Sequence, residues 1–381
     1  MGKDGRMPLL LMSHESWRHH RLSDGAIIQQ GANMILKKSK FLKGAMLFGS
    51  LFIGLSSPAT AADDLFPSVD EQVPRYSPQT PVSGKVEIDG SNTMKTILEA
   101  WRDKLEKIHP DLEISLKTEG SSTGVESLMS GKTKIAAMSR PMTTQEIEKF
   151  TQQAGYAPTA IPVAVDAFAI FVHKDNPLDH ITLQQLDALF SSDRRRGAPE
   201  SINTWGQLGL SGVWEKSSIV PHIRDAKSGT GQFFREFVLL DGKDKEMSVV
   251  QPGAASIVHA VMNDPYAVGY SGIGYRTNSV KPLQVAADDG DAFVEPTFQS
   301  ATNGTYPLHR VLYLYVNEPP DMEHAPLLSE IIKFAVSLEG QQVVAKSGFF
   351  PLPTKDLIAL SATWSRPMAS VSNTKGPKNL K

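Results

Sequence analysis

Three short segments place hydroxyl and glycine residues at the expected start of a helix, where an anion can bind. They are residues 86–93, 120–124 and 224–231. A helix N-terminus presents unpaired N–H groups and about half a positive charge, and glycine lets the backbone approach a ligand closely. Ser and Thr are also ordinary N-caps, so one such segment alone is weak support. Three of them, one led by Arg224, predict a shared oxyanion-binding site.

The third segment also contains the residue types of a hydrolase triad, namely Ser228, His222 and Asp225. A nucleophile elbow requires Gly-x-Ser-x-Gly, whereas Ala226 and Thr230 occupy the two glycine positions. The histidines are scattered and form no His-x-x-x-His pair. The absence of cysteine excludes thiolate chemistry, disulfides and Cys-ligated zinc. We therefore expect a binding protein with no catalytic residue, metal or cofactor.

Alternating strand-like and helical patterns are expected to position these segments. The expected strands are residues 86–88, 112–117 and 134–138, and the expected helices are 93–109, one opening at 120–124 and one opening at the capping box of Thr143 and Glu146. Strands that alternate with helices indicate an α/β fold with a parallel sheet. Ligands of such sheets bind at the carboxyl ends of the strands, where the three segments lie.

Two long apolar stretches, residues 167–177 and 311–319, resemble each other and are typical of β-strands. A pair of strands that enters and leaves a middle segment is what a two-strand hinge needs, although two ordinary core strands are the alternative. We expect two lobes, each a mixed sheet flanked by helices, with residues 83–170 and 312–365 in lobe one, residues 171–311 in lobe two, and a disordered tail over 366–381.

The N-terminal region has the pattern of a secretory signal peptide. Four lysines within residues 37–43 precede an apolar run over 44–55, and Ala59-Thr60-Ala61 supplies a small-residue cleavage site. The alternative to a signal peptide is a membrane-spanning helix, but the apolar run is shorter than the ~20 residues that such a helix requires. Residues 1–33 are either an uninterpreted N-terminal extension or an untranslated stretch ahead of a start codon at Met34. The further expected segments are a signal peptide over 34–61, cleaved after Ala61, and a Pro-rich lead-in over 62–82.

The charge that remains after cleavage limits the partners. Without residues 1–61 the chain keeps 31 basic and 38 acidic residues, a formal net charge of −7, and this argues against nucleic acid as a partner. No cysteine is available for a lipoprotein anchor. We therefore expect an exported, periplasmic protein that is a monomer.

The order of the motifs resembles that of a known family. In sequence they are Asp89-Gly90-Ser91-x-Thr93, Gly120-Ser121-Ser122-x-Gly124, Ser139 after an Ile-Ala-Ala-Met strand, Arg224-x-x-x-Ser228-Gly229-Thr230, Val268-Gly269-Tyr270, and the ending over 347–352. This order is similar to that of the periplasmic phosphate-binding proteins of bacterial phosphate ABC importers, and the resemblance covers residues 83–353. It implies two α/β lobes that close on one desolvated inorganic phosphate without a metal, and a membrane permease as partner.

The resemblance also implies which residues bind phosphate. They are Ser91, Asn92, Thr93, Ser122 and Ser139 in lobe one, and Arg224, Ser228, Gly229 and Thr230 in lobe two, with Thr123 as a further candidate. Arg224 would present a planar fork to two phosphate oxygens. The alternatives are a plain N-cap for each Ser or Thr and a surface ion pair for Arg224.

Arg140 departs from the family pattern, in which an Asp often follows the Ser that aligns with Ser139. That carboxylate accepts the proton of protonated phosphate and disfavours sulfate. Arg140 either adds a second cation or points to solvent, and Glu119 and Asp225 are the nearest acceptors in the sequence. A sulfate- or molybdate-class ligand, a sensing role, and an exported protein without a transport role all stay open.

Overall fold

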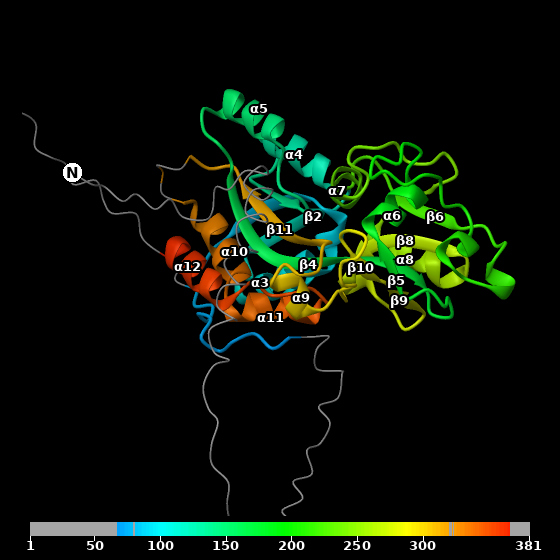
Figure 1. The fold of residues 1–381 in the computed structure, drawn as a ribbon. Helices are drawn as coiled ribbons and strands as arrows, with labels where there is room; N and C mark the ends of the chain where they lie inside the picture. Colours follow the sequence, from blue (N-terminus) through cyan, green and yellow to red (C-terminus); the bar gives the residue numbers. More distant parts are fainter. Residues whose placement is uncertain (1–66, 79–80, 320–321, 323, 366–381) are drawn as a thin grey trace, which may run out of the picture. The chain divides into compact units, whose positions relative to one another are not determined.

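A computed structural model describes residues 67–78, 81–319, 322 and 324–365, all within the compact unit Ala61–Lys381 (Figure 1). The strands are β1 Gly84–Gly90, β2 Leu112–Lys117, β3 Ile135–Met138, β4 Thr159–His173, β5 His180–Thr182, β6 Val220–Arg224, β7 Val249–Gln251, β8 Ala267–Gly272, β9 Val280–Pro282, β10 Gln284–Ala286 and β11 His309–Val316. The α-helices are α3 Lys95–Ile108, α4 Ser121–Met129, α5 Thr144–Ala154, α6 Leu183–Phe190, α7 Gly229–Phe237, α8 Ala254–Asn263, α9 Phe298–Thr302, α10 Pro326–Ala335, α11 Leu338–Lys346 and α12 Thr354–Trp364. Short 3-10 helices span Asn92–Met94, Trp205–Leu208, Gly212–Trp214 and Ile273–Tyr275.

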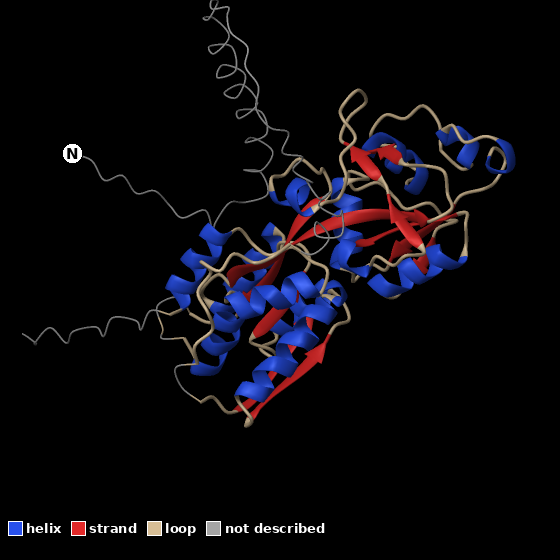
Figure 2. Cartoon of the chain, turned by 90° about the horizontal axis from the view of Figure 1, so that it is seen from below, coloured by secondary structure: helices blue, strands red, loops and turns tan. Residues whose placement is uncertain are grey.

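One long strand connects the two halves of the sheet. The strand order is β2-β1-β3-β11-β4-β8-β6-β7, with β9 also paired to β4. The first part of β4 pairs with β11 up to Ala167, and the second part pairs with β8 from Phe168 onward. Figures 1 and 2 show β4 running from the half that contains β1, β2 and β3 to the half that contains β6 and β8, with helices packed around both. The fold is therefore the expected two-lobed α/β arrangement.

Strand direction differs between the two kinds of pairing. The pairs that join β1 to β2 and β3, and β6 to β7 and β8, are parallel. β4 runs antiparallel to both β11 and β8, so the sheet is mixed. The register between β4 and β11 shifts between Leu312 and Tyr313, beside Pro162. Proline lacks an N–H group and is tolerated within strands mainly at such irregularities.

The predicted elements of the first half are present with small changes in their bounds. The helix expected over 93–109 forms as α3, after a turn of 3-10 helix, and the strand over 112–117 forms as β2. Thr143 and Glu146 make the reciprocal capping box that opens α5. The stretch over 167–177 is the end of a longer strand, because β4 already begins at Thr159. The signal peptide, residues 1–33, residues 62–66 of the lead-in and the tail over 366–381 lie outside the described residues.

The described part of the lead-in packs on the fold although it forms no helix or strand. Val73 is buried, and the carbonyl of Pro74 accepts a hydrogen bond of 2.9 Å from the N–H of Leu338. The Tyr76 hydroxyl donates to Glu330 Oε2 over 2.7 Å and contacts His109 Nε2 at 2.8 Å. These contacts hold residues 67–78 against α10 and α11.

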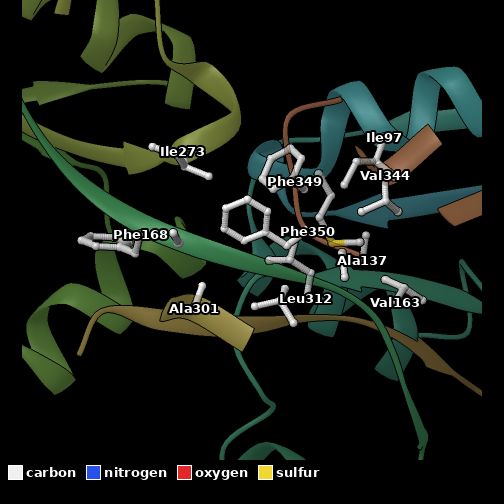
Figure 3. Packing of buried hydrophobic residues seen from close by; sticks show 14 of the residues in the cluster. Ile97, Ala137, Val163, Phe168, Ile273, Ala301, Leu312, Val344, Phe349 and Phe350 are labelled. Carbon is white, nitrogen blue, oxygen red and sulfur yellow. The ribbon is translucent and has the colours of Figure 1, made fainter. Parts of the chain in front are cut away.

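Buried hydrophobic side chains pack along β4 in both halves of the fold (Figure 3). Phe350 forms two backbone hydrogen bonds of 2.8 and 2.9 Å with Val165, so the segment after α11 adds a short pairing to β4. Phe349 and Phe168 are also fully buried. A core that is continuous along β4 links the packing of both halves.

An ion pair lies at the point where β4 changes partner. Asp166 Oδ2 accepts hydrogen bonds of 3.0 and 2.7 Å from Arg310 at the start of β11, while Asp166 Oδ1 accepts the N–H of Ile273 over 3.2 Å. Arg310 also stacks over the rings of Phe168 and Phe233. Asp166 and Arg310 are both buried, so this pair ties three segments together where the lobes meet.

We predict that Asp166→Ala lowers the free energy of unfolding by about 3–5 kcal/mol, because it leaves the Arg310 charge buried without a partner. The double variant Asp166→Leu, Arg310→Met should recover much of the loss, since apolar side chains of similar size tolerate burial. Glu113→Gln is the matched control, because the Lys85–Glu113 pair is 79% and 60% exposed and should contribute less than about 1 kcal/mol. Urea unfolding of the purified protein measures all three. A loss for Asp166→Ala as small as the control's would contradict the role of the pair.

Candidate anion-binding site

The starts of α4 and α7 meet at the end of β3, side by side in Figure 1. A Cβ atom on Gly229 would lie 2.1 Å from Ser121 Oγ and 2.7 Å from Ser139 Oγ, so only glycine allows this approach. Ser121 Oγ accepts the N–H of Ser139 over 3.1 Å and lies 3.3 Å from Ser139 Oγ. Both serines are fully buried. Two helix N-termini and two hydroxyl groups are thus brought together from distant parts of the sequence.

The end of β1 adds a third polar segment to the same place. The hydroxyl groups of Thr93 and Thr230 lie 2.8 Å apart, and both residues are buried. Ser91 is also buried, and its Oγ has no hydrogen-bond partner among the described residues. Gly90 adopts a φ of +139°, and a Cβ there would lie 2.1 Å from the carbonyl oxygen of Ala137. Glycine at this position therefore lets β1 pass close to β3 and deliver Ser91.

Arg224 is a buried cation at the end of β6. Its side chain is 1% exposed, Nη2 donates to the Pro252 carbonyl over 3.4 Å, and Nε and Nη1 have no partner among the described residues. Burial lowers the pKa of Arg224, and no carboxylate of the described residues forms an ion pair with it. The backbone N–H donates to the hydroxyl of Tyr270 over 3.1 Å, and that ring stacks on Phe234 of α7. An unpaired, buried guanidinium favours an anionic ligand.

Ser228 caps α7 and does not belong to a triad. Its Oγ accepts the N–H of Gly231 over 3.2 Å, and its own N–H donates to Asp225 Oδ1 over 3.0 Å. The His222 ring bonds to Gln251 at 3.0 Å rather than to Ser228. Asp225 therefore orders the loop before the helix, and the structure gives the triad residue types no nucleophilic arrangement.

Two of the predicted site residues direct their side chains elsewhere. Asn92 Nδ2 donates to the Thr118 carbonyl over 3.2 Å, and its Oδ1 accepts the N–H of Ala254 at the start of α8 over 3.0 Å. Thr123 Oγ1 donates to the Gly120 carbonyl over 2.8 Å. Asn92 thus links β1 to α8, while Thr123 closes the first turn of α4.

Ser121 is the residue that the motif alone did not single out. The sequence favoured Ser122, but Ser122 is only half-buried and its Oγ accepts a 2.7 Å hydrogen bond from Gln232 Nε2. Ser121 lies deeper, against Ser139 and Gly229. The sequence signal for Ser121 was its place in the same Gly-Ser-Ser motif, which does not tell which serine faces inward.

The described residues contain neither a cluster of metal ligands nor a helix that could span a membrane. Among the described residues no three His, Asp or Glu side chains gather in a way that could hold a metal ion. In the same part of the chain, no helix combines the length and the apolar character needed to cross a bilayer.

Comparison with known proteins shows the family of the chain. A family model described as a PBP superfamily domain matches residues 76–339. A phosphate-binding protein PstS of Pseudomonas aeruginosa is 42% identical over 318 residues, covering 84% of this chain and 96% of that protein. The chain belongs to the phosphate-binding protein family of this superfamily. A PstS of Staphylococcus saprophyticus is 30% identical and covers 72% of this chain and 82% of its own.

Solved structures of the family share the fold. A phosphate ABC transporter substrate-binding protein from Clostridium perfringens, solved with bound phosphate, gives a TM-score of 0.59 at 28% identity and covers 71% of this chain and all of its own. An ABC-type phosphate transport receptor from Vibrio cholerae gives a TM-score of 0.56 at 24% identity and covers 70% of this chain and all of its own, which supports the fold alone.

In this family member Arg140 neither lies free in the site nor points to solvent. It is 5% exposed and pairs with Glu146 through two hydrogen bonds of 2.7 Å. Arg140 Nη1 also donates to the Pro141 carbonyl over 2.8 Å, and Nε donates to Gln232 Oε1. Glu119, considered as a replacement acceptor, is exposed. Glu146 therefore neutralises the charge of Arg140.

The Arg140–Glu146 pair should make stability depend on pH. Burial alone would raise the pKa of Glu146, but the hydrogen bonds and charge of Arg140 outweigh burial and hold the pKa below its ordinary value of 4.5. A lowered pKa in the folded state means that the contribution is present above the ordinary pKa and is lost as pH falls through the folded value.

We predict that Glu146→Gln lowers the free energy of unfolding by about 1.5–3 kcal/mol at neutral pH. Glutamine still completes the capping box with Thr143, so the variant removes the charge and keeps the helix start. Urea unfolding from neutral pH to below the ordinary pKa of Glu146 should show the difference from wild type shrinking as pH falls. A difference that stays constant with pH would show that the ion pair is not its source.

Proposed function

We propose that this protein is a receptor that binds inorganic phosphate between its two lobes and delivers it to an ABC importer. The observation that carries the proposal is Arg224, a buried guanidinium with two N–H-bearing nitrogens free of protein partners. The start of α7 lies beside it, since a Cβ atom on Gly231 would be 3.1 Å from Arg224 Cβ, and the same helix start approaches Ser121 and Ser139 at Gly229. The relatives named phosphate-binding protein support the identity of the anion.

The proposed binding chemistry needs only the chain's own groups. Nε of Arg224 and Nη2 on the same edge of the guanidinium would donate to two oxygens of one phosphate in a planar, bidentate arrangement, since the second hydrogen of Nη2 does not point toward Pro252. The N–H groups at the starts of α4 and α7 would donate to the others, aided by the positive ends of the helix dipoles. Ser91, Thr93, Ser139 and Thr230 would add hydroxyl groups to this shell.

The lobe boundaries are part of the proposal. We place residues 83–170 and 312–365 in lobe one and residues 171–311 in lobe two, with β4 passing between them. The Thr93–Thr230 contact and the approach of Gly229 to Ser121 then join the lobes, as in a closed receptor. Binding would shift the population toward this closed arrangement.

Location, partners and class follow from the same proposal. A signal peptide over 34–61, outside the described residues, would export a periplasmic monomer that meets a membrane permease and does not bind nucleic acid. A receptor of this kind is not an enzyme, and His222, Asp225 and Ser228 make separate hydrogen bonds rather than a triad. A sensing role without transport would use the same site.

We predict that Arg224→Ala weakens phosphate binding by about 2–5 kcal/mol, because it removes the charge-assisted bidentate contact. Arg224→Lys should recover only part of the affinity, since an ammonium group cannot present two parallel donors. Arg235→Gln is the matched control, because Arg235 lies on α7 but pairs with Asp244 at 3.3 Å. Calorimetric titration of protein stripped of ligand measures each affinity. Arg224→Ala within threefold of wild type would overturn the assignment of lobe two.

We also predict that sulfate competes with phosphate and that phosphate affinity rises between about pH 6 and pH 8, as phosphate loses its second proton. The carboxylates on the elements that form the site are bonded to protein groups: Asp89 to Ser127, Asp166 to Arg310, Asp225 to the N–H of Ser228, and Glu146 to Arg140. Because each of these carboxylates is already directed toward a donor of the protein, we expect none of them to accept the proton of monoanionic phosphate. Competition titrations with sulfate and molybdate test this.

Two results would change the proposed ligand. Complete rejection of sulfate, with affinity independent of pH, would show that a proton acceptor faces the ligand. Tighter binding of sulfate or molybdate than of phosphate would move the receptor to another oxyanion class. Failure to bind any tetrahedral oxyanion at millimolar concentration would contradict the receptor function itself.

A further inference from the structure

Gln232 bridges two segments that are far apart in the sequence. It lies in the first turn of α7, where Nε2 donates to Ser122 Oγ over 2.7 Å and to the Ala226 carbonyl over 2.8 Å. On the other side of the amide, Oε1 accepts the N–H of Arg140 Nε. Both ends of this amide are therefore bonded to residues that we place in lobe one.

Its partners are themselves held in place. The guanidinium of Arg140 is fixed by the hydrogen bonds that it donates, two of 2.7 Å to Glu146 and one of 2.8 Å to the Pro141 carbonyl. Ser122 follows the buried Ser121 at the start of α4, and the N–H of Ser122 donates to the Lys227 carbonyl over 3.3 Å. Arg140 is thus oriented by contacts within lobe one before it meets the Gln232 amide, which lowers the entropy cost of that contact. The bond between Ser122 and Lys227 joins residues that we place in different lobes, as the Gln232–Ser122 bond does.

The position of Gln232 on α7 couples it to the anion site. Gly229 and Thr230, in the same first turn of α7, lie against Ser121 and Thr93. Gln232 therefore lies at the edge of the proposed phosphate site. Because α7 and the pair of α4 and Arg140 are in different lobes in our division, opening of the lobes would break the contacts of Gln232 with Ser122 and Arg140 while leaving its bond to Ala226 intact.

We propose that Gln232 is an interlobe latch: a positioning residue that holds the lobes closed over the bound anion through Ser122 and the Glu146-anchored Arg140. This inference rests on the proposed function and adds a role for the position at which the chain departs from its family. Arg140 serves here as a fixed donor to the latch and is not a ligand of the anion. The latch slows release of the ligand, since the contacts form after the anion has entered.

The test compares release and capture of phosphate in wild type and Gln232→Ala. We expect the dissociation rate to rise about tenfold, as for the loss of hydrogen bonds worth roughly 1.4 kcal/mol, while the association rate changes less than about twofold. Chase of radiolabelled phosphate by excess unlabelled phosphate measures release, and stopped-flow mixing measures capture. The unfolding free energy without phosphate should match that of wild type, which separates a latch from a structural role.

Further variants make the test specific. Gln184→Ala is the matched control, because Gln184 Nε2 bonds only to the Arg196 carbonyl, within lobe two, at 3.1 Å. Gln232→Glu keeps an acceptor for Arg140 but loses the donor to Ser122, so its dissociation rate should lie between those of wild type and Gln232→Ala. Ser122→Ala should raise the rate less in the Gln232→Ala background than in wild type, because the two residues share a contact.

Each outcome has one meaning. Wild-type protein that binds no phosphate contradicts the proposed function. Wild-type protein that binds phosphate and releases it at the same rate as Gln232→Ala overturns the latch alone. A Gln232→Ala variant whose apo stability falls together with its association rate would also overturn the latch, since it would give Gln232 a structural role.

Discussion

The burial of the Arg224 guanidinium is the constraint on which the site depends. A charge taken out of water is expensive unless it is paired, and no described carboxylate pairs with Arg224. The Tyr270 hydroxyl fixes the backbone beside it, and the stacked Phe234 ring anchors α7 to the same aromatic group. The chain therefore carries the desolvation cost of a cation in its unliganded state, and a bound anion offsets this cost.

The site exists only where the two halves of the sheet meet, and β4 makes that meeting possible. One strand that pairs with β11 before Ala167 and with β8 after it belongs to both cores, so each half is rigid while the crossing stays narrow. The Asp166–Arg310 pair lies at this crossing and satisfies a backbone N–H of the second half. β1 and β3 are parallel to each other in one half, and β6 is parallel to β8 in the other half, and the segments after β1, β3 and β6 carry the polar residues of the site. The polar groups of the site come from loops that these strands hold.

Local patterns in the sequence predicted where helices and strands lie better than they predicted which side chains are buried. Strand periodicity located β2 and the capping box of Thr143 and Glu146 located α5, because both signals are local. Which of Ser121 and Ser122 lies deeper in the site depends on which serine faces β3 and α7. The Asn92 side chain instead accepts a hydrogen bond at the start of α8. These are contacts between segments more than a hundred residues apart or between neighbouring strands, which no local pattern encodes. The sequence did not predict that β4 begins at Thr159, because proline is unusual inside a strand. The strand tolerates Pro162 at a shift in its register with β11.

The pairing of charges around the site explains why a cation at position 140 is compatible with an anion receptor that is acidic overall. Glu146 neutralises Arg140, and Asp166 neutralises Arg310, although the Arg310 charge adds to burial in lowering the pKa of Arg224. One guanidinium without a carboxylate partner and the N-termini of α4 and α7 are then the groups that we propose face the ligand. Helix termini act through short, directed N–H groups rather than through long-range charge. Recognition in such a site depends on the number and direction of donors. The identity of residue 140 therefore matters through the partners it orients, above all Gln232, more than through its charge.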